Sequence, residues 1–544
     1  MRKKIYISSC GYAVGAKKTA VCLTGGDGFV LENVKTGEPV YRGRLSPSYE
    51  DTESGDVVRI ADFSDFDIPG EYCIKCGFRR SQSFEIGVGI YSWIKDIILD
   101  GMYLNRCGCE PMSDEGAALY KNFLHKKCHT GLTPMFFGGQ MIDASGGWHC
   151  GGGFGKYVTI TALTCAAMLY AYRLYPESFT EEVGNTPKII NECRWGLEWL
   201  LRMQSADGGI YHKCDTAVHS DELSSVSSKD EEYYVFPESC QAAVLFTAVT
   251  ALAARVFEEF DRSFSKKLSR AASNSWLWIA NSDSYEPWEL PTGAKPGGLG
   301  DIPDNDDNDD YIWAMCELYE LTGDELFHKK FADMVYYTDT TGFSVNNTGG
   351  FAALSYIMGT EKKDPTILFY IKKKFGDRAD KLAAASERDG YGSALGAKPN
   401  FAGYDMLSNM TVISDCLICQ TAYMLFGLQK YIDAASMALQ YLMGKNPMGV
   451  TYITGVSEDS PERPRHSISY KCGESVPGMI VCGANYFRND EFSRWRLGKH
   501  TPPAKCYIDN ECSVSTNEPY ISFAAAALMA FAFFDRNGSG QLPK

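Results

Sequence analysis

Hydrophobic and polar positions follow two different periods along the chain, and the change falls near residue 90. Up to about residue 88, apolar and polar residues alternate between turn signals, as in KKTAVCLTGGDGFVLENVKTGEPVYRG and GEYCIKCGFRRSQSFEIG. Alternation with a period of two predicts short strands that are buried on one face. Residues 1–88 are therefore predicted to form a small β-sandwich of about immunoglobulin (Ig) size.

From Tyr91 onward the apolar residues recur at helical spacing. This spacing predicts helices over 91–106, 156–174, 187–203, 237–260, 264–280, 309–322, 325–338, 366–386, 411–426, 428–443 and 517–535, with weaker signals over 115–124 and 348–358. About twelve helices suit six helical hairpins in a ring, so residues 89–544 are predicted to form one mainly α domain. The long loops 281–308 and 444–516 are rich in Gly, Pro and Asp, and such loops often carry binding residues.

Composition narrows the classes of partner. The chain has 544 residues, of which 45% are hydrophobic and 22% charged, with a net charge of −15. An acidic surface repels nucleic acid and anionic membranes, so neither is expected as a partner. The amino terminus MRKKIYISSCGYAVG lacks the pattern of a secretory signal, and the apolar segment 520–534 is shorter than the ~20 residues that cross a bilayer. An odd number of cysteines, 19, then predicts mostly reduced thiols in a cytoplasmic protein.

One glycine-rich stretch, DASGGWHCGGGFGKYV at residues 143–158, combines a histidine, a cysteine and a lysine with three consecutive glycines. It matches neither a Walker nor a dinucleotide fingerprint, because the spacing and the preceding strand are missing. Composition alone leaves a metal site and a phosphate cradle open.

Several dispersed segments carry a family resemblance. The runs MYLNRCG, SGGWH followed by GKYV, LLRMQSADGGIYHK, MGKNPMGVTYITGVSEDSPERPRH, PGMIVCGAN and STNE follow the predicted sandwich in this order. Between about residues 5 and 535 the chain resembles the family 9 glycoside hydrolases. The resemblance implies an amino-terminal Ig-like domain, an (α/α)6 barrel, and cellulase-type activity on β-linked glucosaccharides, here short ones such as cello-oligosaccharides, without an organic cofactor.

The resemblance also implies a catalytic pair. Such enzymes invert the anomeric carbon with two carboxyl groups, one protonating the leaving oxygen and one deprotonating the attacking water. Glu518 in STNE matches the general acid, although a glutamate beside a helix start is also favoured by the helix dipole. The family's Asp-Ala-Gly-Asp segment, which holds the base, is replaced by Cys150 to Gly153. Glycine accepts no proton, and a thiol with a pKa near ~8.5 is mostly neutral at pH 7.

Substrate contacts are expected on both sides of this pair. The family's Pro-His-His-Arg run is Pro464 to Ser467 here, which makes Arg465 and His466 candidate sugar-binding residues. Lys156 is a further candidate, and Trp148 is a candidate stacking platform for a sugar ring. Trp288, Trp313, Tyr211 and Tyr404 are other aromatic candidates, although each such residue is more often part of a core.

A metal site is the second expectation from the resemblance. Cys107, Cys128, His129 and His149 match the structural zinc ligands of some family members. Two thiolates and two imidazoles give closed tetrahedral coordination, which stabilises a fold. Cys109 could replace Cys107, and Cys150 could compete with it, whereas Asp143 is expected to be structural. The acidic run 301–313 lacks the glycine and glutamate of an EF-hand loop and is predicted to be a solvated turn that leads into a helix.

Three interpretations of a site with an acid and no base stay open. Hydrolysis can persist with a base supplied from elsewhere. Inorganic phosphate can attack instead, since an anion needs no base, with glycine amides, Lys156 and Arg465 holding it. In the third interpretation the protein binds a saccharide without turnover.

Overall fold

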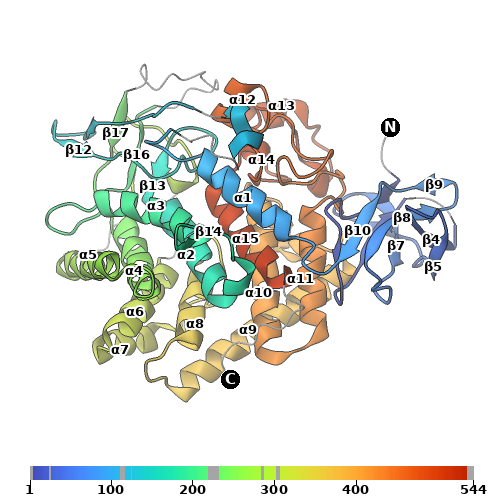
Figure 1. Cartoon of the computed structure of the whole chain (residues 1–544), viewed down its shortest axis with the longest axis horizontal. Helices are drawn as coiled ribbons and strands as arrows, with labels where there is room; N and C mark the ends of the chain where they lie inside the picture. Colours follow the sequence, from blue (N-terminus) through green and yellow to red (C-terminus); the bar gives the residue numbers. More distant parts are fainter. Residues whose placement is uncertain are drawn as a thin grey trace.

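The structure is a computed structural model that describes residues 4–23, 26–110, 117–123, 125–218, 232–282, 287–301 and 307–535. The strands of the first 87 residues gather at one side of the molecule, and the much larger remainder is mainly helical with a few short strands (Figure 1). A mainly helical barrel preceded by an Ig-like sandwich is the fold class predicted from the pattern, and it is confirmed.

The described part of the amino-terminal domain contains ten strands in two facing sheets. Their bounds are β1 Ile5–Tyr6, β2 Tyr12–Ala13, β3 Thr19–Cys22, β4 Gly28–Asn33, β5 Pro39–Arg44, β6 Tyr49–Asp51, β7 Asp56–Asp62, β8 Gly70–Cys76, β9 Arg79–Arg80 and β10 Phe84–Gly87. One sheet has the order β1-β3-β7-β6 and the other the order β2-β10-β8-β4-β5, with β9 paired to β8. Phe29, Phe63 and Phe84 are buried between the sheets, as the alternating pattern requires.

The long helices of the second domain match the helical periodicity. They are α1 Ser92–Leu104, α2 Val158–Leu174, α3 Lys188–Arg202, α4 Cys240–Phe257, α5 Arg262–Asn281, α6 Asn308–Thr322, α7 Glu325–Met334, α8 Gly349–Met358, α9 Pro365–Arg388, α10 Ser408–Phe426, α11 Gln429–Leu442 and α15 Ile521–Asp535. The predicted helix 115–124 is a 3-10 helix at Ala117–Phe123, and its remaining positions lie outside the described residues.

Short elements fill the loops between the long helices. They are β11 Leu132–Pro134, β12 Met141–Asp143, β13 Lys156–Tyr157, β14 Glu182–Val183, β15 Thr186–Pro187, β16 Lys213–Thr216, β17 Tyr233–Val235, α12 Ser467–Cys472, α13 Glu491–Arg496 and α14 Val514–Asn517. The pattern predicted only loops over 444–516, because helices of four to six residues are too short to show a period.

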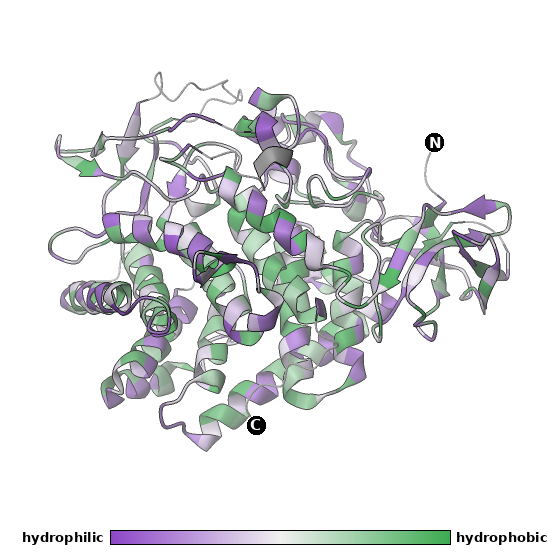
Figure 2. Cartoon of the chain, viewed as in Figure 1, coloured by the Kyte–Doolittle hydropathy of each residue, from purple (hydrophilic) through white to green (hydrophobic). Residues whose placement is uncertain are grey.

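Six helices form the inner wall of the barrel. Helix α15 packs against α2 and α10, α2 against α4, α4 against α6, and α6 against α8, while α9 contacts both α8 and α10. The inner helices are apolar along most of their length, whereas outer helices such as α5 and α9 carry polar residues toward solvent (Figure 2). Among the described residues one helix, α4, is long and apolar enough to cross a membrane, and 94% of it is buried inside the protein as a core helix.

The inner helices all start at the same end of the barrel, because each follows an outer helix that runs the opposite way. Backbone hydrogen bonds tie these starts together: Ile521 N–H of α15 donates to the Cys150 carbonyl at 3.1 Å, and Asn409 N–H of α10 donates to the Cys482 carbonyl at 3.0 Å. The Cys482 N–H in turn donates to the Glu518 carbonyl at 3.0 Å. The glycine-rich stretch, Glu518 and the start of α10 therefore lie close together.

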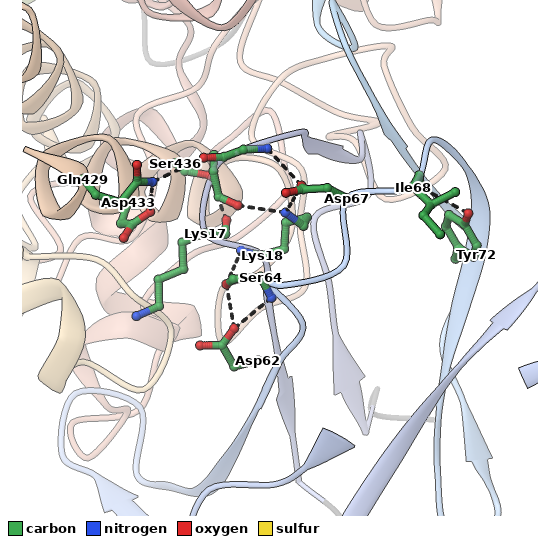
Figure 3. Close-up of polar contacts among 12 residues, drawn as sticks. Lys17, Lys18, Asp62, Ser64, Asp67, Ile68, Tyr72, Gln429, Asp433 and Ser436 are labelled. Atoms are coloured by element: carbon green, nitrogen blue, oxygen red, sulfur yellow. Dashed lines mark hydrogen bonds and ion pairs between the residues drawn. The ribbon is translucent and has the colours of Figure 1, made fainter. Parts of the chain in front are cut away.

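Polar contacts join the sandwich to the barrel (Figure 3). Ser436 of α11 donates to the Lys17 carbonyl at 3.0 Å, and Gln429 donates to the Gly15 carbonyl at 3.2 Å. Lys18 on the same segment forms an ion pair of 2.7 Å with Asp67. These contacts fix one edge of the sandwich against the outer helix α11.

Candidate active site

Glu518 lies between α14 and α15, and two donors hold its side chain. The Gly152 N–H donates to Oε1 at 3.0 Å, and the Tyr520 hydroxyl donates to Oε2 at 2.7 Å. The side chain is only slightly exposed, at 6% for the residue. The carboxyl group is thus fixed against the glycine-rich stretch, in the geometry of a positioned acid rather than of a loose residue at a helix start.

Other parts of the chain pack closely on the glycines at 151 and 152. A Cβ on Gly152 would lie 2.0 Å from the Arg465 carbonyl oxygen, and a Cβ on Gly151 would lie 3.0 Å from the Tyr520 ring. The family places alanine at the position of Gly151. Here the missing methyl group makes room for the Tyr520 ring, so Gly151 and Tyr520 fit each other.

The two positions of the family's aspartates differ in character. Cys150 is fully buried, and burial raises the pKa of its thiol to about 11, so the thiol is neutral at pH 7. Its sulfur accepts a hydrogen bond from the Tyr157 N–H at 3.3 Å. At Gly153, by contrast, a Cβ would meet no atom of the described residues within 4 Å. Position 153 therefore faces open space beside the glycine that binds Glu518.

Two predicted substrate contacts do not fit the structure. Trp148 is fully buried, its ring packs on Gly196 of α3, and its indole N–H donates to Glu192 Oε1 at 2.8 Å. Lys156 is fully buried, and its Nζ donates to the carbonyls of Ala144 and Gly146 at 2.5 and 3.0 Å. Both side chains brace the inner side of the stretch, so the substrate-binding role predicted for them is wrong.

Arg465 and His466 are adjacent in sequence but lie in different environments. His466 is 1% exposed, and its ring nitrogens contact Ser469 Oγ at 2.9 Å and Asn105 Oδ1 at 2.8 Å. Burial lowers the pKa of His466 to about 4, which leaves a neutral imidazole with a structural role instead of the predicted substrate contact. Arg465 is half-buried; its backbone carbonyl covers Gly152 and its Nη1 donates to the Glu511 carbonyl at 3.2 Å.

The aromatic candidates belong to the interior. Trp313 is fully buried, Trp288 stacks on His212 with ring centroids 3.8 Å apart, and the remaining two tyrosines, Tyr211 and Tyr404, are also buried. Each side chain thus has the core position that is more common for its type. None of the four presents a free ring face as a stacking platform.

Tyr520 links Glu518 to a second loop, and sequence reasoning did not identify it. Its hydroxyl donates to Glu518 Oε2 at 2.7 Å, and the backbone of Leu299 lies near the hydroxyl. The loop with Leu299 is held in place by Lys213, whose Nζ contacts Asp301 at 2.6 Å. The sequence held one signal for this role of Tyr520: a tyrosine stands two residues after Glu518, and a glycine that can make room for its ring stands at 151.

The acidic run 301–313 is not a solvated turn where the structure describes it. Asp301, Asp309 and Asp310 are all buried. Thr348 at the start of α8 donates its N–H to Asp309 and its hydroxyl to Asp310, the latter at 2.7 Å. The predicted solvation is therefore wrong for Asp301, Asp309 and Asp310, whereas the run leads into α6 as predicted and residues 302–306 lie outside the described residues.

The four predicted metal ligands converge. One ligand atom from each of Cys107, Cys128, His129 and His149 lies within 4.8 Å of all the others. The two sulfurs are 3.9 Å apart, Cys107 Sγ is 3.7 Å from His129 Nδ1, and Cys128 Sγ is 3.3 Å from His149 Nε2. A tetrahedral zinc with Zn–S of ~2.3 Å and Zn–N of ~2.0 Å has ligand–ligand edges of about 3.3 to 3.8 Å, so the donor set fits this ion.

Neighbouring groups orient these ligands. His149 Nδ1 contacts the Phe154 carbonyl at 3.0 Å, which leaves Nε2 toward the other ligands, as is usual for metal-bound histidine. Tyr233 donates to the same carbonyl at 2.8 Å and stacks on the His129 ring with centroids 4.3 Å apart. Cys150 and the partly exposed Cys109 lie outside the cluster. Asp143 accepts hydrogen bonds from Ser145 and is exposed.

An Ig-like sandwich, a barrel of six helical hairpins and a buried glutamate before the last inner helix together define a cellulase-like glycoside hydrolase. The model of glycosyl hydrolase family 9 matches residues 91–531, and that of the cellulase N-terminal Ig-like domain matches residues 1–81. The chain belongs to glycosyl hydrolase family 9.

Similar proteins act on β-glucans. The chain is 27% identical to a cellodextrinase of Butyrivibrio fibrisolvens, with 97% of this chain and 100% of that protein covered. It is also 27% identical to a xyloglucan-specific endo-beta-1,4-glucanase of Bacteroides ovatus, covering 97% and 93%. A solved metagenome-derived family 9 endoglucanase has a TM-score of 0.88 and 29% identity, with 98% of each chain covered.

Proposed function

We propose that the protein cleaves β-glucosidic bonds of short cello-oligosaccharides with Glu518 as the general acid. The observation that supports this most directly is the Glu518 carboxyl group, held by the Gly152 N–H and the Tyr520 hydroxyl at the end of the barrel where the inner helices start. A positioned, slightly exposed carboxyl group suits proton donation to a leaving glycosidic oxygen. Cellodextrinase and endoglucanase relatives fit the same substrate class.

The attacking group is proposed to enter through the open space at Gly153. In an inverting reaction the nucleophile approaches the anomeric carbon from the side opposite the acid. Among the described residues no side chain occupies the space beside the Gly153 Cα, and the neutral Cys150 thiol cannot accept a proton there. Water attacking at this point would lose its proton to the substrate, to solvent or to a base from elsewhere in the site.

Phosphate is the second candidate nucleophile, because an anion needs no general base. The absence of both loop carboxylates removes repulsion of an incoming anion. Against it stands Lys156, whose ammonium group is buried inside the fold and donates to two backbone carbonyls. Arg465 is then the remaining cation next to the glycine-rich stretch that is predicted to hold a phosphate ion. The test described next detects a phosphorylated product if one forms.

The test is turnover of cellotetraose with and without inorganic phosphate, followed by ¹H and ³¹P NMR. We expect glucose or cellobiose with an inverted anomeric centre, independent of phosphate. Sugar 1-phosphate that forms only with phosphate would establish phosphorolysis, and saturable binding without products would establish a binding protein. Glu518→Gln should lower turnover by about 10²- to 10⁴-fold; unchanged turnover in this variant would refute the acid assignment.

Tyr520 is proposed to position Glu518. Tyr520→Phe removes a hydrogen bond to a carboxyl group, an interaction of about 1.5 to 3 kcal/mol. We therefore expect kcat to fall about 10- to 100-fold with a smaller change in KM, measured on cellotetraose. Tyr441→Phe, a buried tyrosine of α11, is the matched control. An equal loss of activity in both variants would mean that Tyr520 acts only through general packing.

We also propose that Cys107, Cys128, His129 and His149 hold a structural zinc ion. Closed coordination by four side chains leaves no open position for chemistry, so the ion would stabilise the fold around the glycine-rich stretch. His149 directly precedes Cys150, which ties the metal cluster to the stretch that binds Glu518. A reducing cytoplasmic location, predicted from the odd cysteine count, would keep both thiolates available.

A further inference from the structure

The β6–β7 hairpin of the sandwich contacts two loops of the barrel. In its turn, the Glu53 carbonyl accepts a hydrogen bond from the Ala504 N–H at 3.0 Å, and Asp51 Oδ1 accepts one from the Gly390 N–H at 3.0 Å. The fit is close, because a Cβ on Gly390 would lie 2.9 Å from Asp51 Oδ1. The hairpin is therefore fixed both to the loop that follows α9 and to the loop that leads toward α14 and Glu518.

Asp56, at the start of β7, forms an ion pair across the same interface. Its Oδ1 accepts a hydrogen bond from Lys505 Nζ at 2.8 Å, and its Oδ2 accepts one from the Tyr391 hydroxyl at 2.8 Å. Asp56 is 5% exposed, and the Lys505 side chain is 19% exposed. Removing one partner of such a buried pair leaves a charge without compensation, so each group holds the other in place.

The segment that begins at Lys505 is bonded to the residue that precedes Glu518. The Tyr507 hydroxyl donates to Asn517 Oδ1 at 2.6 Å, and Asn517 is fully buried. Cys506 alone separates Lys505 from Tyr507, and Asn517 directly precedes Glu518. A short, hydrogen-bonded path therefore leads from the sandwich to the backbone of Glu518.

Asn517 also connects to the glycine-rich stretch. Its Nδ2 donates to the Arg463 carbonyl at 2.7 Å, and its backbone carbonyl accepts a hydrogen bond from the Arg465 N–H at 3.0 Å. The Arg465 carbonyl in turn covers Gly152, whose N–H donates to Glu518. Asn517 therefore fixes the backbone on one side of Glu518, whereas the contact with Gly152 fixes its carboxyl group.

The sandwich is attached to the barrel at a second place, and that attachment leads to a different element. Ser436 and Gln429 of α11 donate to backbone carbonyls of the segment that leads to Lys18, which pairs with Asp67. The groups that bind the Glu518 side chain come from other segments than α11. A change at Asp56 and a matched change at Asp67 should therefore affect the acid differently.

We propose that Asp56 of the sandwich is a positioning residue for the general acid, acting through Lys505 and Asn517 on the backbone of Glu518. The inference rests on the proposed function for the role of Glu518 as the acid. A displacement of about 1 Å in a reacting group can cost about 10²-fold in rate, so a small shift of this backbone would be measurable. The sandwich would thus influence the rate of bond cleavage from outside the barrel.

The test is Asp56→Asn in the full chain, which removes the charge and keeps the shape of the side chain. We expect kcat on cellotetraose to fall at least about 5-fold while KM changes less than about 2-fold, at a temperature where every variant is folded. Amide hydrogen exchange, followed by mass spectrometry, should rise in peptides from residues 505–518. Lys505→Met tests the same contact from the barrel side, including the case in which Asp56→Asn does not fold, and Lys505→Arg should keep the activity.

Asp67→Asn is the matched control, because it makes the same change in the sandwich ion pair with Lys18, at 2.7 Å. It should leave kcat and the exchange of residues 505–518 unchanged. An equal loss in both variants, an unchanged kcat in Asp56→Asn, or a lower kcat without a local rise in exchange would overturn the positioning role. Absence of products from the unmodified chain would instead refute the proposed function, and the exchange measurement would still decide whether Asp56 fixes the segment before Glu518.

Discussion

Gly153→Asp is expected to raise the rate of cello-oligosaccharide hydrolysis by about 10²- to 10⁴-fold, the usual contribution of a positioned general base. Gly153 takes the position of the family's base, and a Cβ there meets nothing within 4 Å. Its backbone does not require glycine either, since it is absent from the positions with positive φ. An aspartate can therefore enter the open space without moving its neighbours and accept the proton of attacking water.

Gly153→Asn is the control for this gain, because it has the same shape and no basic carboxylate. We expect it to stay at the level of the unmodified protein in initial-rate measurements with cellotetraose. If both variants gain activity equally, the effect comes from filling space and the base hypothesis is wrong. If neither gains, the nucleophile does not approach through position 153.

The long helices were predictable because burial repeats along them. Helices such as α2 and α15 are apolar on nearly every face, and their length alone separates them from strands. The segment 444–516 was not predictable, because its short helices α12, α13 and α14 are held by side-chain and backbone hydrogen bonds instead of by a periodic apolar face.

The sequence allowed us to predict which segments form the candidate site, but not which way their side chains point. The sequence placed Glu518 and the glycine-rich stretch in one site, and the structure joins them through the Gly152 N–H. The sequence could not show that Trp148 and Lys156 point into the protein. In an irregular loop the side-chain directions follow no fixed period, so position in the sequence does not reveal which side chains are buried. The buried position of Trp148 depends on its hydrogen bond to Glu192, and that of Lys156 on hydrogen bonds to backbone carbonyls. The positions of these partners follow only from the tertiary fold.

The glycine-rich stretch still holds Glu518 although both family aspartates are replaced. Gly152, which is also the family's residue at this position, is covered by the Arg465 carbonyl oxygen, and a Cβ on Gly151 would lie 3.0 Å from the Tyr520 ring, so Gly151 and Tyr520 fit each other. Tyr520 donates a second hydrogen bond to Glu518, at 2.7 Å. These contacts preserve the position of the acid while leaving the opposite side open.

Cys128→Ser is expected to remove one zinc ion per chain and to lower the free energy of unfolding by about 4 kcal/mol, as loss of a structural metal typically does. The cluster joins segments near residues 107, 128 and 149, and without the ion its two buried sulfurs and two imidazoles would only face one another. Zinc content is measured by elemental analysis of the purified chain, and stability by scanning calorimetry with and without a chelator.

Cys109→Ser is the matched control, because this partly exposed thiol lies beside Cys107 in sequence but outside the cluster. It should retain zinc and melt with the unmodified protein, and a chelator should lower both melting temperatures toward that of Cys128→Ser. Zinc-free protein after purification in zinc-containing medium, with equal melting of the two variants, would contradict the metal site. Because His149 adjoins Cys150, zinc loss should also reduce any activity gained by Gly153→Asp, which links the stability of the cluster to the geometry of the glycine-rich stretch.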